Sequence, residues 1–227
     1  MRWAALISGG KDSICALTRG AAKYRVAYLV NIQAVEDSYM FHVPCASLSR
    51  LVSQAIDIPL VAGISSSHSD ELVLLRNLLK GLDIDGLIAG TIESNFQMRR
   101  LEALCEELDL QLYAPLWERG SEGLLRSMAR SMDILVVQVA AYGMDESWLG
   151  KKLDDAAVDG LIELNKRYGV HIMGEGGEYE TLVLDAPIFK KRIVIVDYTK
   201  QWFGEQYRGN IEVNDVKLVD KRRHERL

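Results

Sequence analysis

The sequence predicts an α/β fold, in which a parallel sheet carries helices on both faces in a Rossmann-like arrangement and a smaller C-terminal α+β subdomain follows. In the first half of the chain, short apolar runs alternate with amphipathic stretches, which is the pattern of strands that alternate with helices. In the second half this alternation becomes less regular. Hydrophobic residues make up 48% and charged residues 26% of the 227 residues, a balance that argues against disorder.

The first half begins with apolar residues from Trp3 to Ile7, which stop at Ser-Gly-Gly and therefore predict a buried strand that ends in a turn. Eight further elements are expected, helices and strands in alternation. They are a helix at Asp12–Ala22, a strand at Val26–Ile32, a helix at Ala46–Ile56, a strand at Leu60–Ala62, a helix at Asp70–Lys80, a strand at Gly86–Ala89, a helix at Gln97–Leu108 and a strand at Gln111–Tyr113.

The second half is expected to begin after a soft boundary between Pro115 and Gly123, which gives domains at 1–120 and 121–227. Its expected elements are a helix at Glu122–Met132, a strand at Ile134–Ala140, a helix at Asp154–Tyr168 that stops at Gly169, and strands at Arg192–Tyr198 and Ile211–Leu218. The basic run from Lys221 to Arg226 is expected to be a solvated tail.

Charge and cysteine content narrow the class of protein. The net charge of -5 disfavours stable nucleic-acid binding, because such proteins need a basic footprint. Cys15, Cys45 and Cys105 form no Cys-x-x-Cys pair, which argues against a disulfide framework and a structural zinc site. A reducing, cytoplasmic location is the default. Neither a secretory peptide nor an apolar run long enough to span a membrane is evident.

The segment from Ser8 to Ser13 reads Ser-Gly-Gly-Lys-Asp-Ser and lies between the first strand and the first helix. Gly9 and Gly10 allow a sharp turn whose amides, with the helix dipole, bind an anion. Lys11 adds a positive charge for a phosphate, and the serine hydroxyls donate hydrogen bonds. Asp12 suits such a site if it holds a cation such as Mg²⁺, or if it caps the helix. The alternative is a glycine-rich turn without a ligand.

This spacing differs from the Walker loop and from the Gly-x-Gly-x-x-Gly loop. It resembles the signature of the PP-loop ATP pyrophosphatases, whose fold is of the adenine nucleotide alpha hydrolase type. The resemblance implies that the segment binds the pyrophosphate end of ATP and that ATP is cut between its α- and β-phosphates.

A second segment, Gly86–Arg100, brings polar residues to a strand end, where open α/β sheets bind their ligands. Gly90 follows the strand and Ser94 lies in the loop. Gln97 and Arg100 are three residues apart, on one helical face, and Arg100 can hold a phosphate or a carboxylate with two hydrogen bonds. The alternative is an ordinary strand–loop–helix connection with polar surface residues.

Two segments of the second half indicate cation binding. Tyr142–Gly150 combines an aromatic pair, Tyr142 and Trp148, with Asp145 and Glu146; the alternative is a helix start in which Asp145 or Ser147 is the cap and Trp148 belongs to the core.

Gly174–Pro187 carries three carboxylates around two glycines: Glu175, Glu178 and Glu180. Such dense like charge is unfavourable without a cation, which can be Mg²⁺ or a cationic substrate. In an extended conformation Glu178 and Glu180 point to the same face. The alternative is a solvent-exposed turn. His42, His68 and His171 lack metal-ligand spacing.

Taken together, the chain resembles the diphthine–ammonia ligases in their short form, a branch of the PP-loop group. The resemblance rests on Ser8–Ser13, on Gly90 with Ser94, Gln97 and Arg100, on Ala141–Gly150, and on Glu175–Thr181 with Asp185 and Pro187. It implies that diphthine on translation elongation factor 2 is amidated with ammonia, through an acyl-adenylate, with release of pyrophosphate and AMP.

The resemblance also implies roles for residues. Lys11, Asp12, Glu175 and Glu178 are expected to act in catalysis, and Asp12 to bind Mg²⁺. The expected ATP-binding residues are Ser8, Gly9, Gly10, Lys11, Asp12, Ser13, Gly90, Ser94, Gln97 and Arg100. Those expected to bind the trimethylammonium-bearing substrate are Tyr142, Asp145, Glu146, Trp148, Glu175, Glu178, Glu180 and Thr181. Free ammonia is the expected nitrogen donor, and a homodimer is the assembly considered.

Two other functions remain open at this point. One is a PP-loop enzyme that modifies tRNA, which the acidic balance and the scattered cysteines disfavour. The other is a sensor that binds adenine nucleotides without chemistry, which would not need the carboxylate-rich second half.

Overall fold

The computed structural model describes residues 1–34, 46–65 and 70–221. His42, Cys45 and His68, and positions 222–226 of the expected tail, lie outside the described residues. The chain divides into two compact units. The first comprises Met1–Tyr39, Val43–Glu118 and Ile188–Lys190, and the second comprises Met40–His42, Arg119–Pro187 and Lys191–Leu227.

The first unit is built on a parallel sheet of five strands in the order β3-β2-β1-β4-β5. The strands are β1 (Arg2–Leu6), β2 (Arg25–Ala34), β3 (Leu60–Ser65), β4 (Gly86–Ile88) and β5 (Gln111–Tyr113). The central strand β1 is almost wholly buried, which explains why its sequence is a continuous apolar run rather than an alternating one. The predicted parallel sheet is therefore confirmed.

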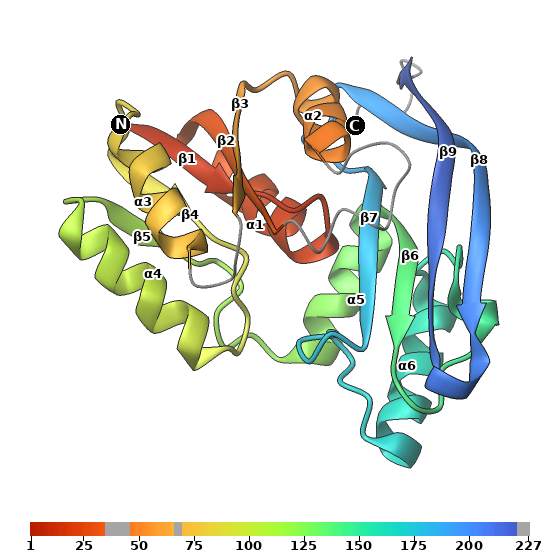
Figure 1. Ribbon diagram of the computed structural model, residues 1–227. Helices are drawn as coiled ribbons and strands as arrows, with labels where there is room; N and C mark the ends of the chain where they lie inside the picture. The colour runs from red at the N-terminus through yellow and green to blue at the C-terminus, as the bar shows by residue number, and fades with distance from the viewer. Residues whose placement is uncertain (35–45, 66–69, 222–227) are drawn as a thin grey trace. The chain divides into compact units, whose positions relative to one another are not determined.

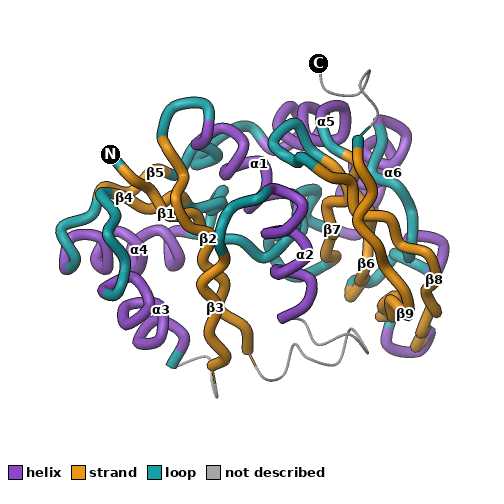
Figure 2. The backbone as a smooth tube through the Cα atoms, turned by 90° about the horizontal axis from the view of Figure 1, so that it is seen from above, coloured by secondary structure: helices purple, strands orange, loops and turns teal. Residues whose placement is uncertain are grey.

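Helices cover both faces of this sheet, as the alternation predicted (Figures 1 and 2). The helices are α1 (Lys11–Ala21), α2 (Ala46–Ile56), α3 (Glu71–Lys80) and α4 (Asn95–Glu107). Leucines of α3 and α4 pack on Ala4, Val30 and Leu87 of one face. On the other face α1 packs so closely that a Cβ atom added to Gly20 would lie 2.4 Å from Cδ1 of Ile88. Figure 2 shows α2 on the same side as α1.

The second unit has an antiparallel sheet of four strands in the order β7-β6-β9-β8 and two main helices. Its elements are α5 (Ser121–Ser131), β6 (Asp133–Ala140), the 3₁₀ helix η2 (Glu146–Trp148), α6 (Asp155–Tyr168), β7 (Tyr179–Asp185), β8 (Lys191–Phe203), the 3₁₀ helix η3 (Gly204–Gln206) and β9 (Arg208–Asp220). Arg126 of α5 binds Asp159 of α6 at 2.7 Å. The α+β architecture is confirmed.

The structure corrects three details of the second half. No strand was assigned between Gly174 and Pro187, yet β7 pairs with β6 there. The strands β8 and β9 are each 13 residues long, because their mutual pairing extends through polar positions that the apolar pattern could not identify. Lys221 is not solvated: it is 7% exposed, and its ammonium pairs with Asp185 and donates to the Ala186 carbonyl. A buried charge needs such partners.

Among the described residues, no helix is long and apolar enough to cross a membrane.

Candidate active site

The loop between β1 and α1 has the geometry of an anion site. Gly9 has a φ of +93°, a conformation that side-chain-bearing residues rarely adopt. Gly10 is the N-cap of α1 and makes no side-chain cap hydrogen bond. The first amides of the helix thus lack a capping side chain, and the dipole of an 11-residue helix adds positive potential at the same point. The loop can receive a phosphate.

The two serines of the loop fix its shape. The Ser13 hydroxyl donates to the Gly10 carbonyl at 3.0 Å and accepts from the Ser8 amide at 3.2 Å. The Ser8 hydroxyl accepts from the Gly10 amide at 3.3 Å and lies 3.3 Å from the Ser13 hydroxyl. These hydrogen bonds close the loop on itself, so that its backbone conformation is set before any ligand arrives.

Lys11 and Asp12 form an ion pair at the start of α1. The distance from Lys11 Nζ to Asp12 Oδ2 is 2.9 Å, and the Lys11 side chain is 4% exposed while that of Asp12 is 27% exposed. A buried ammonium is costly without compensating charge, and the Asp12 carboxylate contributes to that compensation.

Asp12 has the feature expected of a cation ligand. Its second oxygen, Oδ1, is buried and has no hydrogen-bond partner in the part of the chain that the structure describes. A buried carboxylate oxygen without a partner is unfavourable, and a hard oxygen ligand is what Mg²⁺ prefers. The residue therefore fits Mg²⁺. Among the described residues, no group of three or more His, Cys, Asp or Glu side chains could hold a metal ion.

Gly90, which follows the end of β4, packs closely against this loop. A Cβ atom at Gly90 would lie 2.9 Å from the Asp12 carbonyl carbon and oxygen and 2.9 Å from the Ser13 nitrogen. All three are backbone atoms, which cannot turn aside as a flexible side chain can. The absence of a side chain at Gly90 thus allows the segment after β4 to approach the phosphate loop.

The other predicted residues of this segment lie along the start of α4. Ser94 is the N-cap, and its hydroxyl accepts from the Gln97 amide at 3.3 Å. The Gln97 side chain is exposed. The Arg100 guanidinium lies over the Phe96 ring, 4.9 Å from its centroid, in a groove between α3 and α4. The binding of ATP by Ser94, Gln97 and Arg100 stays a prediction.

Tyr142 and Trp148 differ in what their rings can contact. Trp148 is 7% exposed, and its ring is covered by the Lys151 ammonium at 4.5 Å and by Gly160 of α6. This is the core position that the sequence left as an alternative. Tyr142 is 62% exposed and packs edge-on against Tyr168, with ring centroids 5.3 Å apart. Tyr142 is therefore the better placed of the pair to meet a ligand.

Asp145 is a cap in this structure. Its carboxylate accepts from the Ser147 amide at 2.8 Å and from the Ser147 hydroxyl, and it begins η2. These hydrogen bonds from the hydroxyl and the amide hold the pKa of Asp145 below its ordinary value. Glu146, the next residue, is exposed.

Glu178 holds the glycine loop that precedes β7. Its two carboxylate oxygens accept from the Gly176 amide at 2.9 Å and from the His171 amide at 3.1 Å. Glu175 and Glu180 are exposed, and Thr181 is half-buried and pairs with Val136 of β6. The three glutamates thus differ: one shapes the loop, and two present their side chains to solvent.

The two cysteines among the described residues are structural. Cys15 and Cys105 are buried. Burial raises the pKa of the Cys105 thiol to about 11 and also raises that of Cys15. Both thiols are therefore protonated and unreactive near neutral pH.

One residue of interest was not selected from the sequence. Phe96 is 69% exposed on the first turn of α4. The available signal was an aromatic residue between the polar Asn95 and Gln97, at a helix start where no apolar neighbour covers it. That signal is weak, because single exposed apolar residues are common on protein surfaces.

Both halves of the chain match models of known families. Residues 1–112 match the model described as the diphthamide synthase N-terminal domain, and residues 120–219 match the one described as the diphthamide synthase C-terminal domain. The chain belongs to the diphthamide synthase family. The resemblance expected from the sequence is thereby confirmed.

Curated relatives carry the name diphthine–ammonia ligase. The human protein is 40% identical over 222 residues, covering 86% of this chain and 83% of its own. The zebrafish (Danio rerio) protein is 36% identical and covers 86% of both chains. The Schizosaccharomyces pombe protein is 35% identical over 87% of this chain but only 36% of its own. Among solved structures, one match is a chain titled as a predicted subunit of tRNA methyltransferase from Methanocaldococcus jannaschii. The match covers 85% of this chain and 99% of that one, with a TM-score of 0.44 and 16% sequence identity. This likeness is too distant to inform function.

Proposed function

We propose that the chain is a ligase that forms a C–N bond: it amidates diphthine on translation elongation factor 2 with ammonia and converts ATP to AMP and diphosphate. The observation that carries this proposal is the buried Lys11–Asp12 pair, at an uncapped helix start, in a chain whose two halves both match the diphthamide synthase family. The ion pair supports the use of ATP at this loop, and membership of the family supports diphthine as the substrate.

The reaction has two steps in which atoms and charges balance. A carboxylate oxygen of diphthine attacks the α-phosphorus of ATP, and the α–β bond breaks to release diphosphate. Ammonia then attacks the acyl carbon of the adenylate, the bond between the acyl carbon and oxygen breaks to release AMP, and the nitrogen loses one proton to the solvent. Adenylation is needed because a carboxylate is a poor electrophile with a poor leaving group.

The loop residues act on the departing diphosphate. The amides of Gly9 and Lys11 and the Ser8 hydroxyl can donate to phosphate oxygens, whereas the Gly10 amide and the Ser13 hydroxyl hold the loop in shape. The Lys11 ammonium neutralises charge on the diphosphate. Because the serine hydrogen bonds fix the loop beforehand, little reorganisation accompanies the transition state.

Asp12 is the residue of this loop that would hold Mg²⁺, through its unpartnered Oδ1. When bound, the ion supplies further charge neutralisation on the phosphates.

The second unit is proposed to bind the trimethylammonium group of diphthine. Aromatic faces and carboxylates attract such cations. The exposed candidates are Tyr142, Glu146, Glu175 and Glu180. Asp145, Trp148 and Glu178 are proposed to position these loops, since their side chains are engaged in a cap, in the core and with backbone amides. Thr181 stays a predicted substrate residue.

Three further properties extend the proposal. The chain acts in the cytoplasm, uses free ammonia, and does not bind nucleic acid stably, in keeping with its net charge of -5. A homodimer stays a prediction, which sedimentation equilibrium would check.

The test is an incubation of the chain with ATP, Mg²⁺, ammonium and elongation factor 2 that bears diphthine. AMP should form only when the factor is present, and the factor should show the mass change of a carboxylate that becomes an amide. Lys11→Met should abolish AMP release. Lys190→Met removes an exposed lysine, paired with Asp57 in the same unit, and should leave AMP release unchanged. AMP formation that requires tRNA instead of the factor would reject the proposal.

A further inference from the structure

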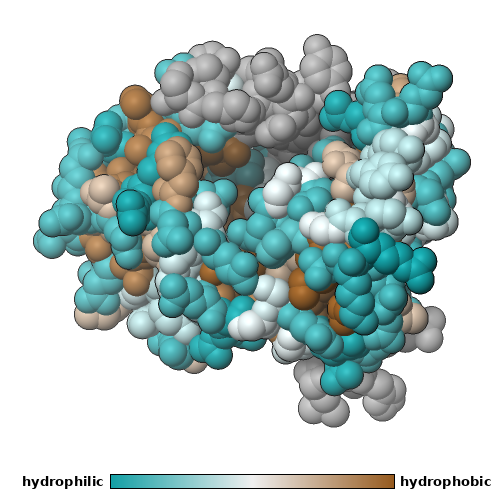
Figure 3. All heavy atoms as spheres, turned by 90° about the horizontal axis from the view of Figure 1, so that it is seen from below, coloured by the Kyte–Doolittle hydropathy of each residue, from teal (hydrophilic) through white to brown (hydrophobic). Residues whose placement is uncertain are grey.

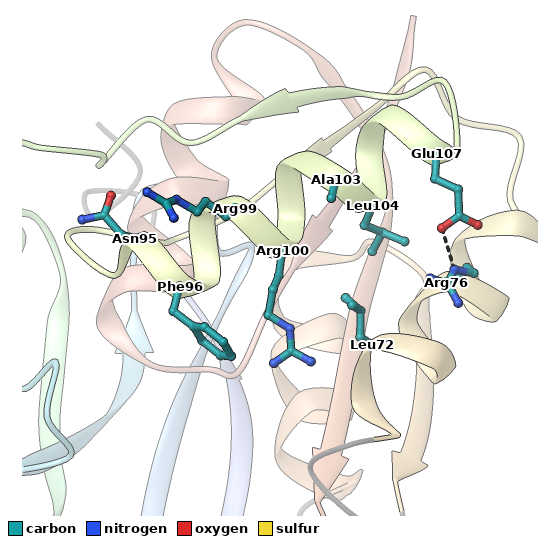
Figure 4. A pocket seen from close by; sticks show the side chains of 9 residues that line it. All are labelled: Leu72, Arg76, Asn95, Phe96, Arg99, Arg100, Ala103, Leu104 and Glu107. Atoms are coloured by element: carbon teal, nitrogen blue, oxygen red, sulfur yellow. Dashed lines mark hydrogen bonds and ion pairs between the residues drawn. The ribbon is translucent and has the colours of Figure 1, made fainter.

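A groove between α3 and α4 combines positive charge with an exposed aromatic ring. Its volume is about 550 Å³, and it is lined by residues that include Arg76, Phe96, Arg99, Arg100 and Glu107. Figure 4 shows Phe96 and Arg100 projecting from the same side of α4, next to Leu72 of α3. In the space-filling view of Figure 3, apolar side chains are exposed among hydrophilic ones on the left of the molecule.

The charges of this groove are not balanced. Three arginines face one glutamate, in a chain whose net charge is -5. The Glu107 carboxylate already forms two ion pairs, with Arg76 Nε at 2.9 Å and with Lys80 Nζ at 3.6 Å. In the part of the chain that the structure describes, Arg99 and Arg100 form no ion pair. The two guanidinium groups are therefore available to carboxylates from outside.

Phe96 adds an exposed aromatic ring to the positive charge of this surface. It is 69% exposed, and the Arg100 guanidinium lies 4.9 Å from its ring centroid, a contact that favours this conformation of the arginine. Aromatic residues and arginines carry much of the binding energy at protein interfaces, because they bury area and form directed hydrogen bonds. A pre-ordered pair of the two loses little conformational freedom on binding.

The groove also starts close to the phosphate loop. Gly90 contacts the backbone of Asp12 and Ser13, and Asn95, the first residue of α4, already lines the groove. Five residues of chain span at most about 18 Å. A protein whose modified side chain reaches the loop therefore brings its neighbouring surface over this part of α4.

We propose that the surface formed by Phe96, Arg99 and Arg100 docks an acidic segment of the protein substrate, in which carboxylates flank an apolar side chain. The carboxylates pair with Arg99 and Arg100 and the apolar side chain covers Phe96. This rests on the proposed function and extends it to the partner's contact surface. Two available arginines are a small footprint for RNA, whose affinity grows with the number of phosphates neutralised.

The experiment measures the binding of elongation factor 2 to the full chain directly, and also the dependence of AMP formation on the concentration of the factor. The variants are Phe96→Ala and the double substitution Arg99→Glu with Arg100→Glu. All three side chains are at least partly exposed, so folding should be preserved. The control is Arg25→Glu, the same charge reversal at an exposed residue of the first unit, at the other end of the strands.

The double variant should weaken the affinity for the factor and raise the KM for it at least tenfold, and Phe96→Ala at least threefold. In Phe96→Ala the Kd for ATP, measured by calorimetry without the factor, should stay the same, and Arg25→Glu should behave as the unaltered chain. Unchanged affinity for the factor in the variants overturns the docking surface. So does a parallel loss of ATP affinity in Phe96→Ala, or a loss confined to RNA binding.

Failure of the proposed function has a different signature. In that case the unaltered chain forms no AMP with the factor, whereas the docking surface is tested by the binding measurement, which requires no turnover. Binding that the double variant abolishes, without AMP formation, would retain the surface and reject the reaction.

Discussion

Gly90→Ala tests whether the approach of the β4 segment to the phosphate loop is essential. The added Cβ atom would lie 2.9 Å from three backbone atoms of Asp12 and Ser13, which is closer than real Cβ contacts. Overpacking of this kind costs about 1–3 kcal/mol. If the strain is relieved by displacement of the loop, the affinity for ATP falls by a factor of about 5 to 150, since 1.4 kcal/mol is tenfold. If the strain instead destabilises the folded chain, the melting temperature falls by about 2–4 °C per kcal/mol.

The assay is calorimetric titration with ATP, combined with thermal denaturation of the same samples. Gly123→Ala is the control, because an added Cβ atom there meets nothing within 4 Å and alanine favours the helix α5. The control should bind ATP as the unaltered chain does and should melt at the same temperature or slightly higher. A Gly90→Ala variant with unaltered ATP affinity and unaltered melting temperature would refute the reasoning.

Three further predictions concern single side chains. Asp12→Asn should weaken ATP binding in Mg²⁺ much more than in EDTA, as measured by the Kd in each buffer; an equal loss in both would separate Asp12 from the metal. Glu178→Gln replaces one acceptor by a donor that faces a backbone amide, which should cost about 1–3 kcal/mol in denaturant unfolding, and unchanged stability would show that the loop is held otherwise. Burial alone raises the pKa of Asp133, but hydrogen bonds and charges from Lys152 and Arg192 outweigh it and hold the pKa below the ordinary 3.8. The unfolded chain then binds the proton more readily, so this stabilisation is complete above about pH 4 and is lost as the pH falls through the lower folded value; an Asp133→Asn variant should lose less stability over that acid range, as urea titrations would record.

The first unit could be predicted almost completely from the sequence. Its central strands β1 and β4 are buried and read as apolar runs, and its helices read as amphipathic stretches. Ser8–Ser13 was identified because a phosphate loop needs glycines, a lysine and hydroxyls within six positions between a strand and a helix. The role of Gly90 in close packing required the structure, since the two segments are 77 residues apart in the chain.

The second unit was harder to predict for a physical reason. The strands β8 and β9 carry many exposed polar residues, and their pairing with each other determines their length. The burial of Trp148 could not be predicted from the sequence either, because it depends on Gly160 and Lys151, which contact the ring only in the folded chain. Phe96 was missed for the same reason, since exposure depends on what lies beside it.

In the proposed reaction, the diphthine carboxylate attacks the α-phosphorus of the ATP that is bound at Ser8–Ser13, and an acyl-adenylate forms. The most direct test uses elongation factor 2 whose diphthine carboxylate is labelled with ¹⁸O, incubated with the chain, ATP and ammonium. Each AMP released should carry one labelled oxygen, because the acyl–oxygen bond breaks when ammonia attacks the adenylate. Label that appears in inorganic phosphate together with ADP, or AMP without label, would contradict it.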